Sequence, residues 1–164
     1  MIYTGKSIGQ LGLIVINEDT TIIMRGGNAS AGDVLQFDLA QTDDNVTNNV
    51  PGHLSSGYVN VIAPTAGGVA GGSILCFALT AINEDEPGPV RLTGIGLVFC
   101  IKGSGNIVPG DKLVATTSKD LDGNTPTIGE RYLAICQTTI TGPSSRTLGT
   151  VLFDGIRGFG TFSA

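Results

Sequence analysis

Two aspartates occur in the same short phrase and are the first candidates for chemistry in this sequence. Asp33 lies in GNASAGDVL and Asp111 lies in GNIVPGDKL, so both stretches read G-N-x-x-x-G-D-x-L. Paired carboxylates flanking one cleft can act as general acid and base when their surroundings separate their pKa values. Neither aspartate has a neighbouring carboxylate, histidine or aromatic platform. The phrase therefore does not predict an acid–base pair.

A turn followed by a strand explains the phrase better. In VPGD the proline sets the φ angle of the second turn position, and the glycine supplies the positive φ of a type II turn. AGD in the first copy has the same shape, and an aspartate side chain can accept backbone N–H groups at such a turn. We interpret the phrase as one supersecondary unit used twice: a turn, a strand, an acidic turn, and a strand bearing Tyr58 or Tyr132.

Two further candidates for chemistry are His53 and an acidic stretch. His53 is the only histidine, it lies in the predicted loop NNVPGHLSSG, and no G-x-S-x-G motif accompanies it. Asp120, Asp122 and Asn124 alternate as at the start of a calcium loop, but Arg131 stands where that loop needs glutamate. An Asx-rich hairpin turn explains these residues equally well, so ion binding is left open. We expect no catalytic, cofactor or metal site, and no enzyme.

The three cysteines are predicted to be buried core residues. Cys76, Cys100 and Cys136 each lie in an apolar run, without C-x-x-C spacing. An odd number in this arrangement argues against a disulfide framework and against a zinc site. Free cysteine commonly behaves as a small hydrophobic residue in protein cores.

The elements that must position these residues are predicted to be strands. No stretch has the apolar spacing of an amphipathic helix, whereas short β-branched runs alternate with turn formers. We expect an all-β protein with a β-barrel or β-tulip-like domain and hairpin or arm extensions. It forms one domain over 1–164, or two lobes, 1–72 and 73–164, sharing one core. The expected strands are 12–16, 20–25, 34–39, 57–63, 73–82, 90–101, 112–117, 131–140 and 147–153.

The composition predicts that much of the surface is covered by other protein. Only 14% of the 164 residues are charged, and 25 are glycine. The runs SILCFAL and GLVFCI read as strands buried on both faces, one against the core and one against a partner. Phe159 and Phe162 in the tail either fold back onto the domain or dock on a neighbour.

Charge argues against nucleic-acid and membrane partners. The net charge is −5, and the nine basic residues are scattered along the chain. No run of them could follow a phosphate backbone or an anionic bilayer surface. The apolar runs have the length of strands and are too short for a membrane helix.

Several stretches together resemble the small capsid decoration, or cement, proteins of tailed bacteriophages. They are AGDVL, PGDKLVATTSKD, ERYLAICQTTITG and the closing LGTVLF, within residues 25–40 and 100–155. The resemblance implies a barrel closed by the last apolar strand. It also implies a homotrimer on the outside of the capsid at three-fold and quasi-three-fold positions, and neither catalysis nor a cofactor.

The expected function is therefore structural. We expect a virion protein on the outer capsid surface, assembled in the host cytoplasm, that binds the major capsid protein and stabilises contacts between capsomers. The alternative is a carbohydrate-binding or adhesin-like β-module of a phage tail or head fibre. Such a module needs aromatic platforms, and the chain offers no tryptophan but has Tyr3, Tyr58 and Tyr132.

Overall fold

The computed structural model describes residues 16–38, 59–65, 73–124 and 128–163. These residues form strands, turns and loops without a helix, which confirms the predicted all-β class. No helix able to span a membrane is found in these ranges. The described strands are β1 Glu18–Met24, β2 Val34–Phe37, β3 Val59–Ile62, β4 Leu75–Ala78, β5 Pro87–Ile101, β6 Lys112–Ala115, β7 Leu121–Asp122, β8 Arg131–Tyr132, β9 Ala134–Cys136, β10 Thr147–Asp154 and β11 Gly160–Thr161.

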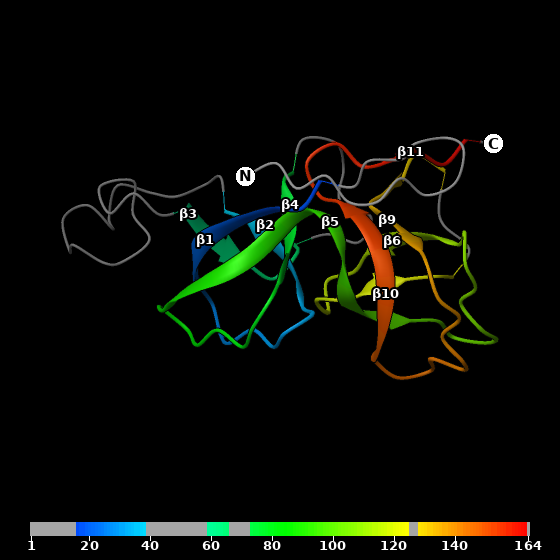
Figure 1. The fold of residues 1–164 in the computed structure, drawn as a ribbon, viewed down its shortest axis with the longest axis horizontal. Coiled ribbons are helices and arrows are strands. Elements are labelled where there is room, and N and C mark those ends of the chain that lie inside the picture. The colour runs from blue at the N-terminus through cyan, green and yellow to red at the C-terminus, as the bar shows by residue number, and fades with distance from the viewer. Residues whose placement is uncertain (1–15, 39–58, 66–72, 125–127, 164) are drawn as a thin grey trace.

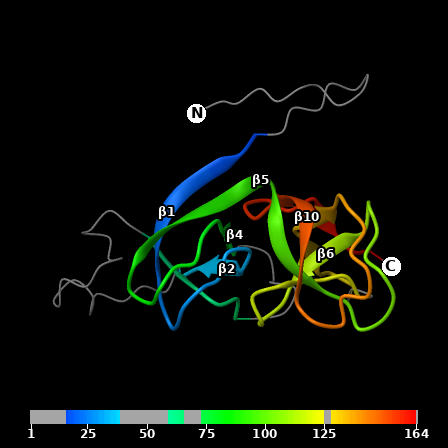
Figure 2. The ribbon, with the colours of Figure 1, turned by 60° about the horizontal axis from the view of Figure 1, so that its bottom comes forward.

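The main sheet closes into two five-stranded rings that share β5. The first ring has the order β1-β3-β2-β4-β5 and is closed by pairing of β1 with β5. The second has the order β5-β10-β9-β6-β7 and is closed by pairing of β5 with β7. Figure 1 shows β5 passing from the side of β1 and β2 to the side of β6 and β10, and Figure 2 shows the same arrangement after rotation. Closure leaves neither ring with a free edge.

The change from one ring to the other occurs near Gly94 in the middle of β5. Up to Thr93, β5 pairs with β1, and from Thr93 onward it pairs with β10. Gly94 has a φ of +121°, and a Cβ there would lie 1.9 Å from Oδ1 of Asn17. That Oδ1 accepts a hydrogen bond from the N–H of Ile95 at 3.1 Å. Glycine is required here because the backbone leaves the usual β region where Asn17 approaches it.

The repeated phrase forms the same turn in both rings. The N–H of Ser30 donates to the Asp33 carboxylate at 3.0 Å, and the N–H of Val108 donates to that of Asp111 at the same distance. The glycine before each aspartate has a φ of +91° in the first copy and +93° in the second. Each Asp carbonyl then accepts an N–H at 2.9 Å, from Ala78 and Cys136 respectively. The predicted turn–strand unit is confirmed.

The equivalence extends around the whole ring. Each strand of the first ring has a counterpart in the second. In order, β1, β2, β3, β4 and the first half of β5 correspond to the second half of β5, β6, β7, β9 and β10. Corresponding strands pair in the same order and direction. Ile82 fills the space beside Gly88 in the first ring, as Ile140 does beside Gly149 in the second. The two rings are therefore two copies of one five-stranded unit.

One part of the predicted unit was wrong. The strand after β6 is β7, which lies in the stretch KDLDGN that we predicted to be a turn. It pairs with β6 and, in parallel, with β5. Tyr132 instead lies on β8, which pairs with β11 outside the rings, and Tyr58 lies outside the described residues. The expected strand 131–140 is divided into β8 and β9, and 12–15 lie outside the described residues.

The two rings have separate hydrophobic clusters that meet at β4. Leu75 and Phe77 belong to the cluster of the second ring, whereas Cys76 and Ala78 belong to the cluster of the first. All four residues are buried. The prediction that a partner chain covers one face of this strand was therefore wrong, because the second ring covers it. The division into one domain, 1–164, or lobes at 1–72 and 73–164 stays a prediction.

Gly155 offers a test of how closely the rings approach one another. Its N–H donates to Leu92 and its carbonyl accepts from Leu75, both at 2.9 Å. A Cβ at Gly155 would lie 2.0 Å from the Leu75 carbonyl oxygen, which is backbone and cannot turn aside. We expect Gly155→Ala to lower the free energy of unfolding by about 1–3 kcal/mol in urea titration.

Gly103→Ala is the matched control for this substitution. The nearest atom to a Cβ at Gly103 is Oδ1 of Asn124 at 3.4 Å, an ordinary contact. Its free energy of unfolding should therefore stay close to that of the unsubstituted protein. Equal stability of the two variants would contradict the close approach of the rings at Gly155.

Candidate functional site

The repeated aspartates are not brought together as a catalytic pair. They belong to different rings, and each has its own cation. Asp33 is buried and pairs with Nη2 of Arg146 at 2.5 Å. Asp111 is partly exposed and lies 3.6 Å from Nζ of Lys102. Each carboxylate also accepts the backbone N–H that closes its turn, so both stabilise local structure.

The possible calcium ligands point to separate partners. The Asp120 carboxylate accepts from the Thr116 hydroxyl and pairs with Nε of Arg146 at 3.4 Å. Asp122 accepts the N–H of Asn124 at 2.7 Å, and the Asn124 side-chain oxygen accepts the N–H of Gly103 at 2.9 Å. Within the described ranges no group of three or more histidine, cysteine or acidic residues could hold a metal. The contact of Asp122 with Asn124 is of the Asx-turn type, although Asp122 itself belongs to β7 and not to a turn.

The three cysteines are free thiols and are buried, as predicted. Burial raises the pKa of the Cys100 thiol to about 12 and also raises the pKa of Cys76 and of Cys136. A buried thiol with a raised pKa carries little thiolate and is a poor nucleophile at neutral pH. His53, the other residue considered for nucleophilic chemistry, lies outside the described residues.

The aromatic tail folds back onto its own chain. β11 pairs with β8, and the N–H of Phe159 donates to the Tyr132 carbonyl at 3.0 Å. The Tyr132 ring stacks on Phe159 with centroids 6.4 Å apart and contacts Phe162 at 5.3 Å. Nζ of Lys112 lies 4.7 Å from the Tyr132 centroid, a favourable cation–π distance. The sequence left open whether Phe159 and Phe162 fold back onto the domain or dock on a neighbour. In the structure they fold back onto the domain.

A buried arginine anchors β8 to the start of β4. The Arg131 guanidinium donates to the carbonyls of Ser73 at 2.6 Å and Ile156 at 3.3 Å. Burial lowers the pKa of this side chain. Both of these acceptors are backbone carbonyls, so Arg131 has a structural role.

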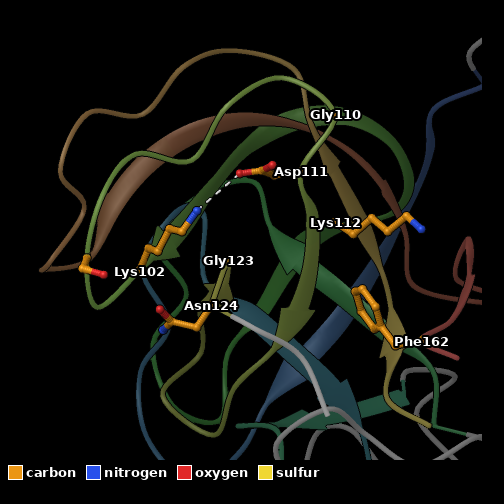
Figure 3. A pocket seen from close by; sticks show the side chains of 8 residues that line it. Lys102, Gly110, Asp111, Lys112, Gly123, Asn124 and Phe162 are labelled. Carbon is orange, nitrogen blue, oxygen red and sulfur yellow. Dashed lines mark ion pairs between the residues drawn. The ribbon is translucent and has the colours of Figure 1, made fainter. Parts of the chain in front are cut away.

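An open groove lies beside the aromatic tail at the end of the second ring. Its volume is about 500 Å³, and Lys102, Ser104, Gly110, Asp111, Lys112, Gly123, Asn124 and Phe162 line it. Figure 3 shows Lys112 and Phe162 at one end and Lys102, Asp111 and Asn124 toward the other. The groove is therefore lined by two lysines, an amide, a hydroxyl and an aromatic ring, and Figure 3 shows the Lys112 ammonium group directed away from Lys102 and Asn124. Such groups can bind a ligand without transforming it.

A second polar cluster joins the two rings. Besides its two aspartates, the Arg146 guanidinium donates to the Lys119 carbonyl at 3.2 Å and lies over the Phe99 ring at 4.2 Å. Asp33 comes from the first ring and Asp120 from the second, so one cation links both. The Lys119 carbonyl also accepts the N–H of Val34 at 2.9 Å, which adds a backbone bond between the rings.

Sequence reasoning did not single out the cations of either cluster. Lys102 precedes the second copy of the phrase and Lys112 lies within it, and this nearness was the available signal. Phe162 reaches the groove only because β11 returns to β8. Arg146 is distant in sequence from both of its aspartates, and nothing local to TGPSSRT points to an ion pair.

Comparison with known proteins finds similarity at the level of the fold. No family model matches the chain, and no curated protein matches its sequence. Among solved structures, the chain is similar to the N base of the head fibre gp8.5 of bacteriophage phi29. The TM-score is 0.52 at 13% identity, over 88% of this chain and 99% of that one. At this identity the likeness shows a shared fold.

The Arg146 cluster predicts a large effect of one substitution. Arg146→Gln leaves Asp33 and Asp120 buried without their cation, and removing one partner of a buried ion pair is costly. The Arg146 side chain is itself 37% exposed, so we expect the free energy of unfolding to fall by about 1–3 kcal/mol, measured by urea titration.

Asp85→Asn provides the comparison for that variant. It breaks the pair between Arg25 and Asp85, in which the aspartate side chain is largely exposed. Asparagine tolerates the positive φ of this position, and an exposed pair contributes only about 0–1 kcal/mol. If Arg146→Gln cost no more than Asp85→Asn, the inter-ring role of Arg146 would be wrong.

Proposed function

We propose that this protein is a structural component of a tailed-phage head. It binds the major capsid protein on the outer surface of the capsid and assembles as a homotrimer. As a decoration protein it bridges neighbouring capsomers, so that many modest contacts act together over the shell. The proposal assigns it no catalytic step and no cofactor.

The observation that carries this proposal is the extent of the fold likeness. The similar chain is the base of a phage head fibre, and nearly all of it is covered. A protein of similar fold is thus already known as the base of a phage head fibre. The sequence resemblance to capsid decoration proteins is an independent line of support, because it rests on short motifs in both rings.

The outer face of the β5–β10 pair supports the trimer. Leu97 pairs with Thr150, and Phe99 pairs with Leu148, so the two leucines are diagonal neighbours on this face. Leu97 is 57% exposed and Leu148 is 45% exposed. Half-buried Ile95, Phe99 and Leu152 extend the face. Two exposed leucines beside one another on a sheet face favour a protein–protein contact there.

Capsid attachment can be tested with heads assembled from the major capsid protein of the same genome. We expect the full-length protein to co-sediment with these heads at a saturating, fixed ratio. We also expect decorated heads to withstand a higher temperature before they break open, because each bound trimer adds contacts between capsomers. Sedimentation and thermal light scattering measure the two effects.

The outcomes separate a decoration protein from the base of a head fibre. Binding with greater head stability supports decoration. Binding that leaves head stability unchanged would favour a fibre base and overturn the bridging role. No binding at saturating concentration would overturn capsid attachment altogether.

The trimer itself can be tested by light scattering behind a sizing column. We expect the mass of three chains, and Leu97→Glu should reduce it to that of one chain because it places a charge in the buried interface. Ile128→Glu, at an exposed apolar residue outside the β5–β10 face, should leave the mass unchanged. A monomeric unsubstituted protein, or equal effects of the two substitutions, would contradict this interface.

A further inference from the structure

The two copies of the repeated turn have different surroundings. In the first ring the turn before β2 is covered by the second ring: Val34 is fully buried, and the Gly32 carbonyl accepts the N–H of Phe99 at 2.9 Å. In the second ring the matching residues, Gly110 and Lys112, line the open groove. The surface that the first copy uses for contact is therefore left accessible in the second.

The groove has a consistent chemical character. Lys102 is held in place, because its Nζ donates to the Asn106 carbonyl at 2.8 Å and lies 3.6 Å from Asp111. Lys112 is exposed and extends over the Tyr132 ring. Two ammonium groups against one carboxylate give the groove a local positive charge on a chain whose net charge is −5. An anionic ligand is favoured at such a place.

The polar and aromatic groups narrow the class of ligand. Because Oδ1 of Asn124 already accepts the Gly103 N–H, its NH2 group is the part that can donate to a ligand. The Ser104 hydroxyl can donate and accept. The Phe162 ring is half-buried and offers an apolar surface, with Nζ of Lys112 5.7 Å from its centroid. Hydroxyl-binding groups, an aromatic ring and cations along one open groove suit a sugar chain that carries carboxylates.

We propose that this groove binds an acidic saccharide. Lys112 pairs with a sugar carboxylate, the apolar face of one sugar ring lies on Phe162, and Asn124 and Ser104 hydrogen-bond to hydroxyls. The groove is formed by β6, the residues after β5 and β7, and the tail, whereas the proposed trimer face is formed by β5 and β10. The inference goes beyond the proposed function and does not depend on capsid attachment.

The test uses oligogalacturonate as the ligand and isothermal titration calorimetry on the full-length protein. We expect saturable binding that weakens with added salt, and no comparable binding of a neutral malto-oligosaccharide. Lys112→Gln should weaken binding about tenfold, because it removes a charge-assisted contact. Phe162→Leu should weaken it by a similar factor. Lys112 is exposed, so its variant tests the site even if Phe162→Leu disturbs the tail.

Arg157→Gln is the matched control. It also removes one exposed positive charge, but from a residue that does not line this groove. Its affinity should stay within about twofold of the unsubstituted protein. Equal losses in Arg157→Gln and Lys112→Gln would show nonspecific charge attraction and overturn the proposal. So would the absence of binding to oligogalacturonate, or tighter binding of a poly-glutamate peptide, which would identify an acidic protein segment as the partner.

Discussion

The contact of Phe77 with the second ring is the constraint on which the rest of this structure depends. Phe77 projects from the outer face of β4 and meets Phe153 edge to face, with ring centroids 5.3 Å apart. Its tip occupies the space beside Gly96, where a Cβ would lie 2.3 Å from the Phe77 ring. A strand of the first ring thus supplies core to the second. Because Leu75 and Phe77 of β4 belong to the core of the second ring, that core is incomplete without the first ring.

The two copies of the five-stranded unit differ at the positions through which the first ring contacts the second. Val34 and Phe77 of the first ring are fully buried against the second, whereas the matching Lys112 and Ile135 are exposed and half-buried. Terminal units of repeat proteins commonly have a polar outer face, which stops further stacking and keeps the protein soluble. In the second ring an exposed lysine, Lys112, stands at the position of the buried Val34. The same replacement provides one of the two lysines that line the groove.

Local signals in the sequence predicted those parts of the fold that local chemistry determines. The Gly-Asp turns, the strands that follow them and the buried cysteines were predicted because each depends on neighbouring residues. β7 was missed because Leu121 lies between Asp120 and Asp122, and only its parallel pairing with β5 makes a strand of it. The apolar faces of β4 were recognised, but a sequence cannot tell whether a partner chain or a second ring covers them.

The candidate site was harder to predict for a related reason. Its groups come from four segments that meet only when the second ring closes and the tail returns along β8. No spacing in the sequence links Lys102 or Asn124 to Phe162. The second copy of the repeated phrase borders the site, because in this arrangement the other unit covers only the first copy. In a two-unit protein of this kind, the first unit uses one surface to contact the second. The equivalent surface of the second unit stays uncovered, and it is therefore the surface most worth testing for a ligand.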